Sequence, residues 1–184
     1  DNTNPFESDG YAPIDDRLGR SPWDARKSSA NTDDLRGKIL RIKVENEGYS
    51  IPEGNLFPED GSEGRPEIYV MGCRNPYRLS FDNHRGYLYW GDVGPDANEL
   101  DDNRGPRGYD EINQARAAGN FGWPLFIGNN LPYNDYDWDT EKSGKLFDPL
   151  TPFNDSRYNT GAKILPPAQP AFFWYSYDLS LIHI

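Results

Sequence analysis

The sequence is short of three features that often mark a site or a compartment: cysteine, histidine and long apolar runs. Cys73 is the single cysteine, so an internal disulfide is excluded, and we interpret this side chain as small, apolar and buried. The two histidines, His84 in a predicted turn and His183 near the chain end, belong to no zinc spacing and no Ser/His/Asp set. No stretch is long and apolar enough to cross a membrane as a helix.

The chain also begins without an initiator methionine or a signal-peptide pattern, at Asp1-Asn2-Thr3-Asn4. We interpret this abrupt start as a cut inside a larger protein and expect the chain to be a fragment. The missing signal therefore says little about where the parent protein resides.

Positive charge is scarce, because 30 acidic residues face 19 lysines and arginines and give a formal net charge of −11. A protein that binds nucleic acid needs a basic surface to displace counterions from phosphate, so we expect no nucleic-acid partner. The same electrostatic argument disfavours anionic membrane surfaces. Acidic residues gathered in loops favour solubility or the binding of Ca²⁺, a cation that prefers oxygen ligands.

Turn-forming and aromatic residues are abundant. The chain holds 18 glycines and 16 prolines, and 14% of its residues are aromatic, although only 35% are hydrophobic. This composition predicts short strands joined by well-defined loops rather than a helical bundle. The net charge also fits a disordered chain, but the aromatic content and the clear strand patterns oppose that alternative.

Alternating apolar residues bounded by turn residues predict a series of short strands. They cover residues 37–44, 67–71, 77–82, 87–92, 109–113 and 171–175. The clearest unit is the hairpin made by the third and fourth of these strands around the turn 83–86. Residues 114–119 fit a single helical turn. Long loops fill residues 1–34, 50–66, 94–108 and 131–170.

Hairpins of short strands separated by long loops are typical of propeller blades or of a β-sandwich, and the loop lengths favour blades. The chain is long enough for only a few blades. We therefore predict an all-β fold, a partial β-propeller with long loops, over residues 1–178. Because an open arc leaves edge strands unpaired, we expect the fragment to fold poorly on its own.

The first candidate binding motif is Arg74-Asn75, between Gly72 and Pro76. Gly72 permits an unusual backbone turn, and Pro76 restricts Asn75 to extended conformations. A guanidinium can stack on a flat conjugated ring or pair with its carboxylates, and an amide beside it can donate to carbonyl oxygens. The competing interpretation is a surface salt bridge for Arg74 and a simple turn role for Asn75.

The second candidate motif combines Gly94-Pro95 with Asp110-Glu111. Gly94 and Pro95 could present carbonyls in a sharp turn, and carbonyls are good Ca²⁺ ligands. Asp110 and Glu111 are neighbours on a predicted strand and point to opposite faces, so only one of them is a plausible ligand, and we favour Glu111.

Two other clusters have competing interpretations. Oxygen-bearing residues between positions 96 and 103 resemble an EF-hand loop only superficially, because the required Gly and the closing Glu are missing; a solvated acidic loop is the better interpretation. Tyr133, Tyr136 and Trp138 alternate with aspartates. They could form a sugar-binding wall or an aromatic loop packed on its own blade, and both interpretations stay open.

An ordered set of motifs carries a family resemblance. In chain order they are Leu35-Arg36-Gly37-Lys38-Ile39-Leu40-Arg41-Ile42, Arg74-Asn75-Pro76, Gly94-Pro95, Asp110-Glu111-Ile112-Asn113 and Gly119-Asn120-Phe121-Gly122-Trp123-Pro124. Each motif is weak alone, but the ordered set is specific. It resembles the core of the quinoprotein family of soluble glucose and aldose sugar dehydrogenases, which use pyrroloquinoline quinone (PQQ).

The resemblance implies a six-bladed β-propeller that binds PQQ and Ca²⁺ on its top face, near the central axis. Arg74 and Asn75 are then implied to contact the quinone. The carbonyls of Gly94 and Pro95 are implied to bind the Ca²⁺ that accompanies the cofactor. In such enzymes a histidine removes the anomeric proton of the sugar while hydride passes to the quinone.

The resemblance further implies that Glu111 and the carbonyl of Phe121 hold a second, structural Ca²⁺. Several departures accompany it. No residue here matches the catalytic histidine, so no catalytic residue is assigned. Val93 stands where relatives often have a polar residue, and Phe121 replaces a common tyrosine. Residues 179–184 do not resemble the family's continuation, and we treat them as a candidate non-native tail.

The function implied by the resemblance is that of a fragment of a PQQ- and Ca²⁺-dependent dehydrogenase that oxidises aldose sugars at the anomeric carbon. The parent would be periplasmic or extracellular, with a sugar substrate and a cytochrome or another electron acceptor as partners. The fragment alone is expected to be inactive. The alternative is a non-enzymatic propeller that binds protein or sugar, as in the hedgehog-interacting proteins.

Overall fold

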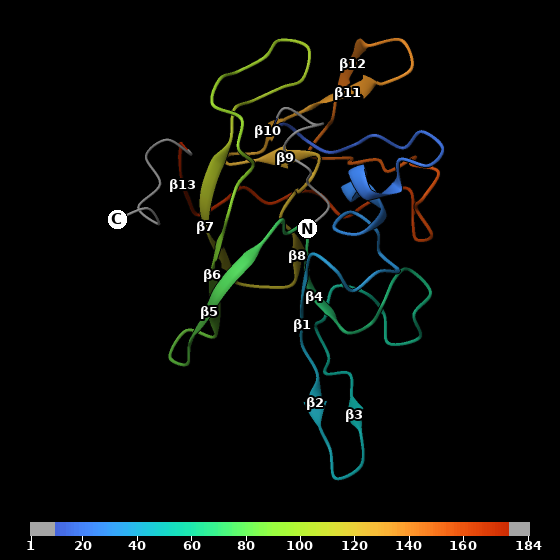
Figure 1. Ribbon diagram of the computed structural model, residues 1–184. Coiled ribbons are helices and arrows are strands. Elements are labelled where there is room, and N and C mark those ends of the chain that lie inside the picture. The colour runs from blue at the N-terminus through green and yellow to red at the C-terminus, as the bar shows by residue number, and fades with distance from the viewer. Residues whose placement is uncertain (1–9, 177–184) are drawn as a thin grey trace.

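A computed structural model describes residues 10–176 of the chain (Figure 1). His183, the candidate tail at residues 179–184 and the N-terminal end of the predicted domain lie outside the described residues. The described part contains no α-helix, and its helical content is limited to two 3₁₀ turns, η1 (Ser21–Trp23) and η2 (Ala25–Lys27). The prediction of an all-β chain is confirmed.

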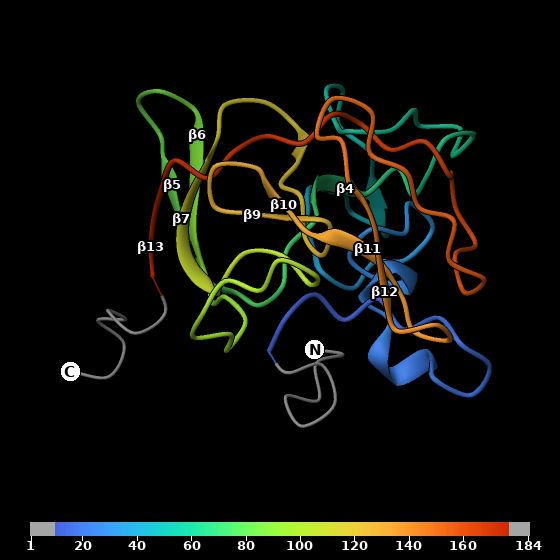
Figure 2. The ribbon, with the colours of Figure 1, turned by 90° about the horizontal axis from the view of Figure 1, so that it is seen from above.

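The largest sheet is antiparallel and has four strands in the order β13-β7-β6-β5 (Figure 2). These strands are β5 (Pro76–Asp82), β6 (Tyr87–Asp92), β7 (Tyr109–Ala115) and β13 (Phe173–Ser176). The predicted hairpin is confirmed as β5 and β6. Its turn is closed by Asp82, whose Oδ1 accepts hydrogen bonds from the backbone N–H groups of His84 and Arg85 at 2.9 and 3.2 Å.

The second sheet has three strands in the order β1-β4-β8. Its strands are β1 (Lys38–Leu40), β4 (Ile68–Met71) and β8 (Gly119–Asn120), and β8 pairs with β4 in parallel. The strand predicted for residues 37–44 is interrupted at Arg41, whose guanidinium turns to Asn55 Oδ1 at 2.8 Å and over the Tyr69 ring. Beyond this break, β2 (Lys43–Val44) pairs with β3 (Tyr49–Ser50) in a hairpin that extends away from the body (Figure 1).

The helical turn predicted for residues 114–119 is wrong. Gln114 and Ala115 complete β7 instead, opposite Tyr89 and Leu88 of β6. Ala115 is fully buried, and Gly119 already begins β8. The ladder with β6 and the burial of Ala115 therefore override the local helical preference of this short segment.

The long loop predicted for residues 131–170 contains short strands that the sequence did not reveal. They are β10 (Leu131–Pro132), which pairs with β9 (Phe126–Ile127), and the hairpin of β11 (Asn134–Asp137) and β12 (Lys142–Leu146). Every residue of β12 is exposed, so this strand carries no alternation of apolar and polar residues.

The two sheets meet in an apolar core centred on Trp90. Trp90 is 2% exposed, and its ring lies edge-on to Phe121 with the centroids 4.7 Å apart. Val70, from the second sheet, and Cys73, which is buried as predicted, belong to the same cluster, as do Ile39 and Ala115. The core therefore brings the end of β4, the end of β6 and residues 119–123 to one place.

Both edge strands of the large sheet keep apolar side chains in contact with solvent. Leu79 and Phe81 of the edge strand β5 are 58% and 56% exposed, and Phe173 of the opposite edge strand is 53% exposed. A four-stranded antiparallel sheet with uncovered apolar residues is what one blade of an open arc presents. The predicted fold class, an all-β partial propeller with long loops, is confirmed.

Candidate functional site

The Arg74-Asn75 turn connects β4 to β5. Gly72 starts it with φ +76°, and a Cβ at this position would lie 2.5 Å from Asn120 Oδ1 and 2.6 Å from the Gly122 nitrogen. Only glycine fits both the backbone angle and the close approach of residues 120–122. The predicted role of Gly72 in shaping this turn is confirmed.

Arg74 extends from the turn towards the neighbouring connection after β6. Its Nη1 donates to the Val93 carbonyl at 2.9 Å, and its guanidinium carbon lies 5.8 Å from the centroid of the Trp123 ring. Burial lowers the pKa of Arg74, and the carboxylates of Asp96 and Asp92 act against that shift. A half-buried guanidinium held in place by a carbonyl is oriented towards a neighbouring loop rather than moving freely at the surface.

Asn75 contributes its backbone to the same turn and leaves its side chain exposed. Its N–H donates to Asp92 Oδ1 at 2.6 Å, and its carbonyl accepts from the Val93 N–H at 3.3 Å. The side-chain amide makes no hydrogen bond to any residue in the range 10–176. It is therefore available to a ligand.

Asp92, the last residue of β6, is a site residue that the sequence reasoning missed. It is 6% exposed, and its carboxylate accepts the backbone N–H groups of both Arg74, at 3.1 Å, and Asn75. Burial raises the pKa of Asp92 to about 7, although these two main-chain hydrogen bonds oppose the shift. A signal was present in the sequence, since an aspartate directly after the apolar run Tyr87–Gly91 is placed where a strand ends in the core.

The Gly94-Pro95 turn packs tightly against the start of β7. The Gly94 N–H donates to Asp110 Oδ1 at 2.8 Å, and a Cβ at Gly94 would lie 1.9 Å from the Tyr109 carbonyl oxygen. The Pro95 carbonyl lies against Gly108, where a Cβ would be 1.7 Å from its oxygen. Asp110 therefore fixes the turn through the Gly94 N–H. Of the two carbonyls predicted to bind Ca²⁺, that of Pro95 packs against Gly108.

Glu111 is buried on β7, with 8% of its surface exposed. Its Oε1 accepts from the Gly128 N–H at 2.6 Å and its Oε2 from Asn113 Nδ2 at 2.9 Å. Burial raises the pKa of Glu111 to about 8, and the nearby Asp92 carboxylate adds to the shift. Two buried carboxyl groups therefore hinder each other's ionisation at this point.

Phe121 uses its side chain for the core and its main chain for the site. The ring packs on Trp90, and the N–H donates to the Met71 carbonyl at 2.9 Å. A tyrosine at this position, as the family resemblance implies, would place a hydroxyl in an apolar cluster. Phe121 lacks that hydroxyl but offers the same backbone groups to the site.

A single small pocket joins these elements, with a volume of about 10 Å³. It is lined by Arg74, Asp92, Val93, Gly94, Tyr109, Glu111, Phe121, Trp123, Phe126 and Ile127. Four of the six predicted site residues are thus brought together, while Asn75 and Pro95 do not line the pocket. Its size suits one water-sized group, so a larger cofactor would lie over its opening.

Larger pockets occur elsewhere on the chain. One of about 580 Å³ is formed by the loop at residues 51–59, and one of about 330 Å³ lies beside Leu100, Leu131 and Leu146. Neither brings together a guanidinium, buried carboxylates and main-chain polar groups. We therefore place the candidate site by its converging polar groups and not by pocket size.

The groups around Glu111 offer few charged ligands to a cation. In the described part of the chain, no three acidic, histidine or cysteine side chains converge as a metal cluster. A cation would therefore depend on Glu111 together with main-chain carbonyls, as the resemblance implies. Asp110 Oδ2, Asn113 Oδ1 and the Tyr133 hydroxyl are buried with no hydrogen-bond partner among residues 10–176, although none of the three residues lines the pocket. Unpartnered oxygens of this kind are compatible with a Ca²⁺ ion nearby.

The aromatic cluster with two open interpretations packs on its own blade at Tyr133. Tyr133 is fully buried and lies edge-on to Trp123 at 6.1 Å. Tyr136 and Trp138 stack against the guanidinium of Arg104 at 4.8 and 4.5 Å. Packing of this loop therefore uses the rings that a sugar-binding wall would need.

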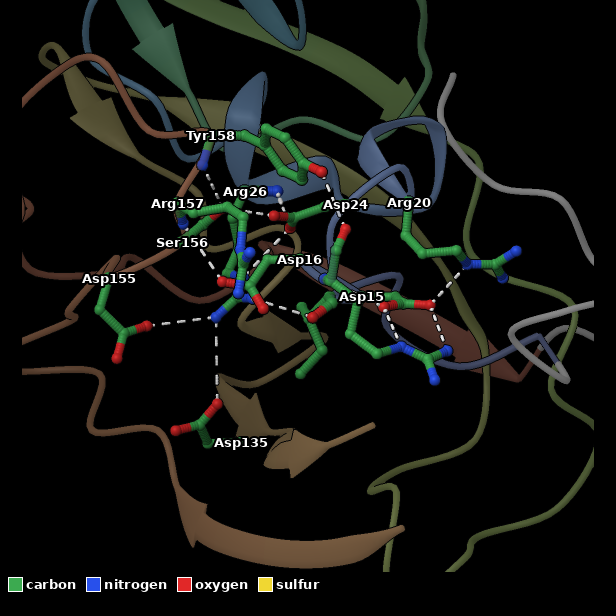
Figure 3. Close-up of polar contacts among 12 residues, drawn as sticks. Asp15, Asp16, Arg20, Asp24, Arg26, Asp135, Asp155, Ser156, Arg157 and Tyr158 are labelled. Atoms are coloured by element: carbon green, nitrogen blue, oxygen red, sulfur yellow. Dashed lines mark hydrogen bonds and ion pairs between the residues drawn. The ribbon is translucent and has the colours of Figure 1, made fainter. Parts of the chain in front are cut away.

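A second polar cluster surrounds the buried guanidinium of Arg26, far from the candidate site in sequence (Figure 3). Arg26 lies 3.1 Å from Asp24, 3.2 Å from Asp155, 3.6 Å from Asp16 and 4.0 Å from Asp135. The hydroxyl of Ser156 also donates to Asp24. The cluster fixes the segment around residues 154–158 against the N-terminal segment, which is a structural role.

Two further predictions concern single positions and the membrane. His84 is exposed in the β5–β6 turn, as predicted, and so lies at the opposite end of these strands from the pocket. Within residues 10–176, no helix has the length and apolar character needed to span a bilayer.

Comparison with known proteins gives a consistent picture. The sequence profile of the family described as "Glucose / Sorbosone dehydrogenase" matches residues 14–166. The HIPL1 protein of Arabidopsis thaliana is 31% identical over 175 residues, which cover 86% of this chain and 24% of that protein. Quinoprotein glucose dehydrogenase B of Acinetobacter calcoaceticus is 31% identical over 113 residues, which cover 59% of this chain and 20% of that protein.

Among solved structures, the soluble aldose sugar dehydrogenase of Escherichia coli in its apo form is 25% identical, with a TM-score of 0.44. The match covers 80% of this chain and 33% of that one. The chain thus spans about a fifth to a quarter of the length of the two curated relatives described above.

Proposed function

The chain belongs to the glucose/sorbosone dehydrogenase family, and we propose that it forms the part of a quinoprotein sugar dehydrogenase that holds PQQ and Ca²⁺. The whole protein would oxidise aldose sugars at the anomeric carbon. The observation that carries this proposal is the convergence of Arg74, Gly94, Glu111 and Phe121 on one pocket. These residues come from three separate connections and one strand, so only the folded chain brings them together.

In this proposal Arg74 and Asn75 bind the cofactor. The guanidinium of Arg74 is already oriented by the Val93 carbonyl and would contact the flat ring system or its carboxylates. The exposed amide of Asn75 would donate to a carbonyl oxygen of the ligand. Bound PQQ supplies the two-electron oxidant for the sugar.

Ca²⁺ would be held by the carbonyls of Gly94 and Pro95 and, at a second position, by Glu111 and the Phe121 carbonyl. The buried carboxyl groups support this assignment, because burying Asp92 and Glu111 beside each other is costly unless a cation compensates their charge. The unpartnered oxygens of Asp110, Asn113 and Tyr133 add to the demand for a cation.

The chain is proposed to supply binding and orientation but no general base. Its one described histidine, His84, is exposed in a distant turn. The catalytic base would then lie in the remainder of the parent protein, together with further groups that bind the quinone. Residence in the periplasm or outside the cell, and a cytochrome or another protein as electron acceptor, are proposed on the family relationship alone.

The test is reconstitution of the intact parent protein with PQQ and Ca²⁺, followed by an assay with aldose sugars and an artificial dye acceptor. We expect dye reduction that needs the quinone, the sugar and Ca²⁺ together and that is lost on chelation. Dye reduction that is independent of PQQ, or none at all, would contradict the enzymatic proposal.

The alternative proposal is a propeller of this family that binds protein or sugar without redox chemistry. The observation that favours it is the lack of a histidine at the pocket among the described residues. A parent protein that binds its ligand equally well with and without PQQ would support this alternative.

A further inference from the structure

The carboxylate of Asp92 crosses from the end of β6 to the turn that precedes β5. Its two oxygens have different partners, since Oδ2 accepts the Arg74 N–H at 3.1 Å and Oδ1 accepts the Asn75 N–H at 2.6 Å. Both bonds are shielded from water because Asp92 is 6% exposed. Hydrogen bonds from backbone N–H groups to a buried carboxylate are among the stronger ones in proteins.

The strand pairing explains why a side chain is needed at this point. Pro76 lies opposite Asp92 in the β5–β6 ladder, and proline has no N–H with which to continue that ladder. The register of β5 then shifts between Tyr77 and Leu79, where Arg78 has φ +63°. The beginning of β5 is therefore poorly held by regular pairing. The Asp92 carboxylate instead holds the two residues before Pro76, because it accepts their backbone N–H groups.

The same device recurs one strand further on. Asp110, at the start of β7, accepts the Gly94 N–H through Oδ1 at 2.8 Å. The two turns are then joined directly, because Arg74 Nη1 donates to the Val93 carbonyl between them. Two buried carboxylates thus fix two adjacent turns, and Arg74 connects the turns to each other.

We propose that Asp92 is a positioning residue for the cofactor: by fixing the backbone of Arg74 and Asn75, it sets the direction in which their side chains meet PQQ. This inference rests on the proposed function. Asp92 does not itself contact the ligand in this proposal and acts only through the two residues whose N–H groups it accepts.

The structure offers a sharp variant and a matched control. In Asp92→Asn one of the two acceptor oxygens becomes an NH₂ group that faces an N–H, so one bond is lost with almost no change in volume. Asp82 lies at the other end of the same hairpin, and its Oδ1 accepts both backbone N–H groups, those of His84 and Arg85. The asparagine in Asp82→Asn keeps that oxygen, so both bonds to the backbone are retained. The two substitutions are chemically identical but differ in the bonds they remove.

The experiment measures two quantities on the intact protein that carries this chain. The first is backbone amide hydrogen exchange at Arg74 and Asn75 without ligand. The second is the Kd for PQQ in the presence of excess Ca²⁺. For Asp92→Asn we expect lost protection at one of these two amides and a Kd raised by about tenfold, the effect of one buried charge-assisted hydrogen bond. Asp82→Asn should leave both quantities unchanged.

An unchanged Kd in Asp92→Asn, or equal effects of the two variants, overturns the inference. Fast exchange of the Arg74 and Asn75 amides in the unmodified protein overturns it as well, and this outcome is decisive even where the variant does not fold. Failure of the unmodified protein to bind PQQ contradicts the proposed function instead, so the two failures are distinguishable.

Discussion

At the scale of single residues, the candidate site depends on charged side chains that are buried. The sequence shows that these residues are acidic or basic but does not show their burial. Arg74, Asn75, Gly94 and Glu111 could be proposed from the sequence because each belongs to a motif with a special backbone requirement or a family resemblance. Asp92 was missed: its place directly after an apolar run indicates a strand end, but the sequence does not show that its carboxylate accepts two backbone N–H groups. Its pairing partner across the ladder, Pro76, becomes informative only once the register is known.

Lys38 is a second buried charge that the sequence does not reveal. It is 8% exposed, and its Nζ donates to the carbonyls of Ser28, Ser29 and Arg36 at 2.7, 3.0 and 3.0 Å. The three acceptors match the three donors of an ammonium group. Ser29 in turn donates to the Cys73 carbonyl at 2.8 Å, so this network supports the residue next to Arg74.

The pH dependence of stability should report Lys38 directly. Burial lowers the pKa of Lys38 to about 7, whereas in the unfolded chain it is about 10.4. Between these values the unfolded chain binds more protons, so the Lys38 contribution to the free energy of unfolding rises with pH, by about 2 kcal/mol from pH 7 to 9. Urea unfolding of the intact protein that carries this chain, unmodified and with Lys38→Met, at both pH values isolates this contribution.

The difference between the two proteins is the relevant quantity, because Asp92 and Glu111, whose pKa values are raised by burial, act in the opposite direction in both of them. Parallel pH profiles for the unmodified chain and Lys38→Met would contradict the assignment of a buried, titrating ammonium.

At the scale of elements, prediction succeeded where alternation and turn chemistry agreed. The β5–β6 hairpin combined both signals and is present as predicted. The failures have physical reasons: Ala115 was assigned to a helical turn although tertiary pairing makes it part of β7, and β12 lacks alternation because it is exposed throughout. Local patterns identify an element only when one of its faces is buried.

The Gly94-Pro95 turn depends on a glycine at the other end of the same β6–β7 connection. A Cβ at Gly108 would lie 1.7 Å from the Pro95 carbonyl oxygen, which is backbone and cannot rotate aside. We expect Gly108→Ala to lower the free energy of unfolding by about 3 kcal/mol because the turn and the start of β7 must separate. Thermal or urea unfolding of the intact protein that carries this chain measures this loss.

Gly48→Ala is the matched control, since nothing lies within 4 Å of a Cβ there and only its φ of +74° is unfavourable. It should cost about 1 kcal/mol. Equal losses for the two variants would show that the turn tolerates a side chain and is not packed as described.

At the scale of the whole molecule, the exposed apolar edge strand of the large sheet is the most conspicuous feature. Leu79 and Phe81 lie two residues apart on edge strand β5, so their side chains project from the same face, and both are more than half exposed. An apolar edge strand of this kind promotes association between copies. The all-β fold class was predictable from composition and loop lengths, whereas the particular exposed edge strand was not.

We therefore expect the isolated chain to self-associate as its concentration rises. The double variant Leu79→Lys and Phe81→Lys should remain monomeric at concentrations about tenfold higher, because charged residues on an edge strand oppose pairing. Sedimentation velocity compares the two. Leu150→Lys, in a loop where Leu150 is 75% exposed, is the control and should associate like the unmodified chain.

The most direct test of the proposed cofactor site is a titration of the intact protein with PQQ in excess Ca²⁺, comparing the unmodified protein with Arg74→Lys and with Arg116→Lys. Arg74→Lys loses the planar guanidinium that donates to the Val93 carbonyl, whereas Arg116 stacks on Tyr87 at an exposed position away from the pocket. We predict a Kd for PQQ raised by about tenfold or more in Arg74→Lys and unchanged in Arg116→Lys. Equal affinity of all three proteins for PQQ would contradict the assignment of this pocket to the quinone.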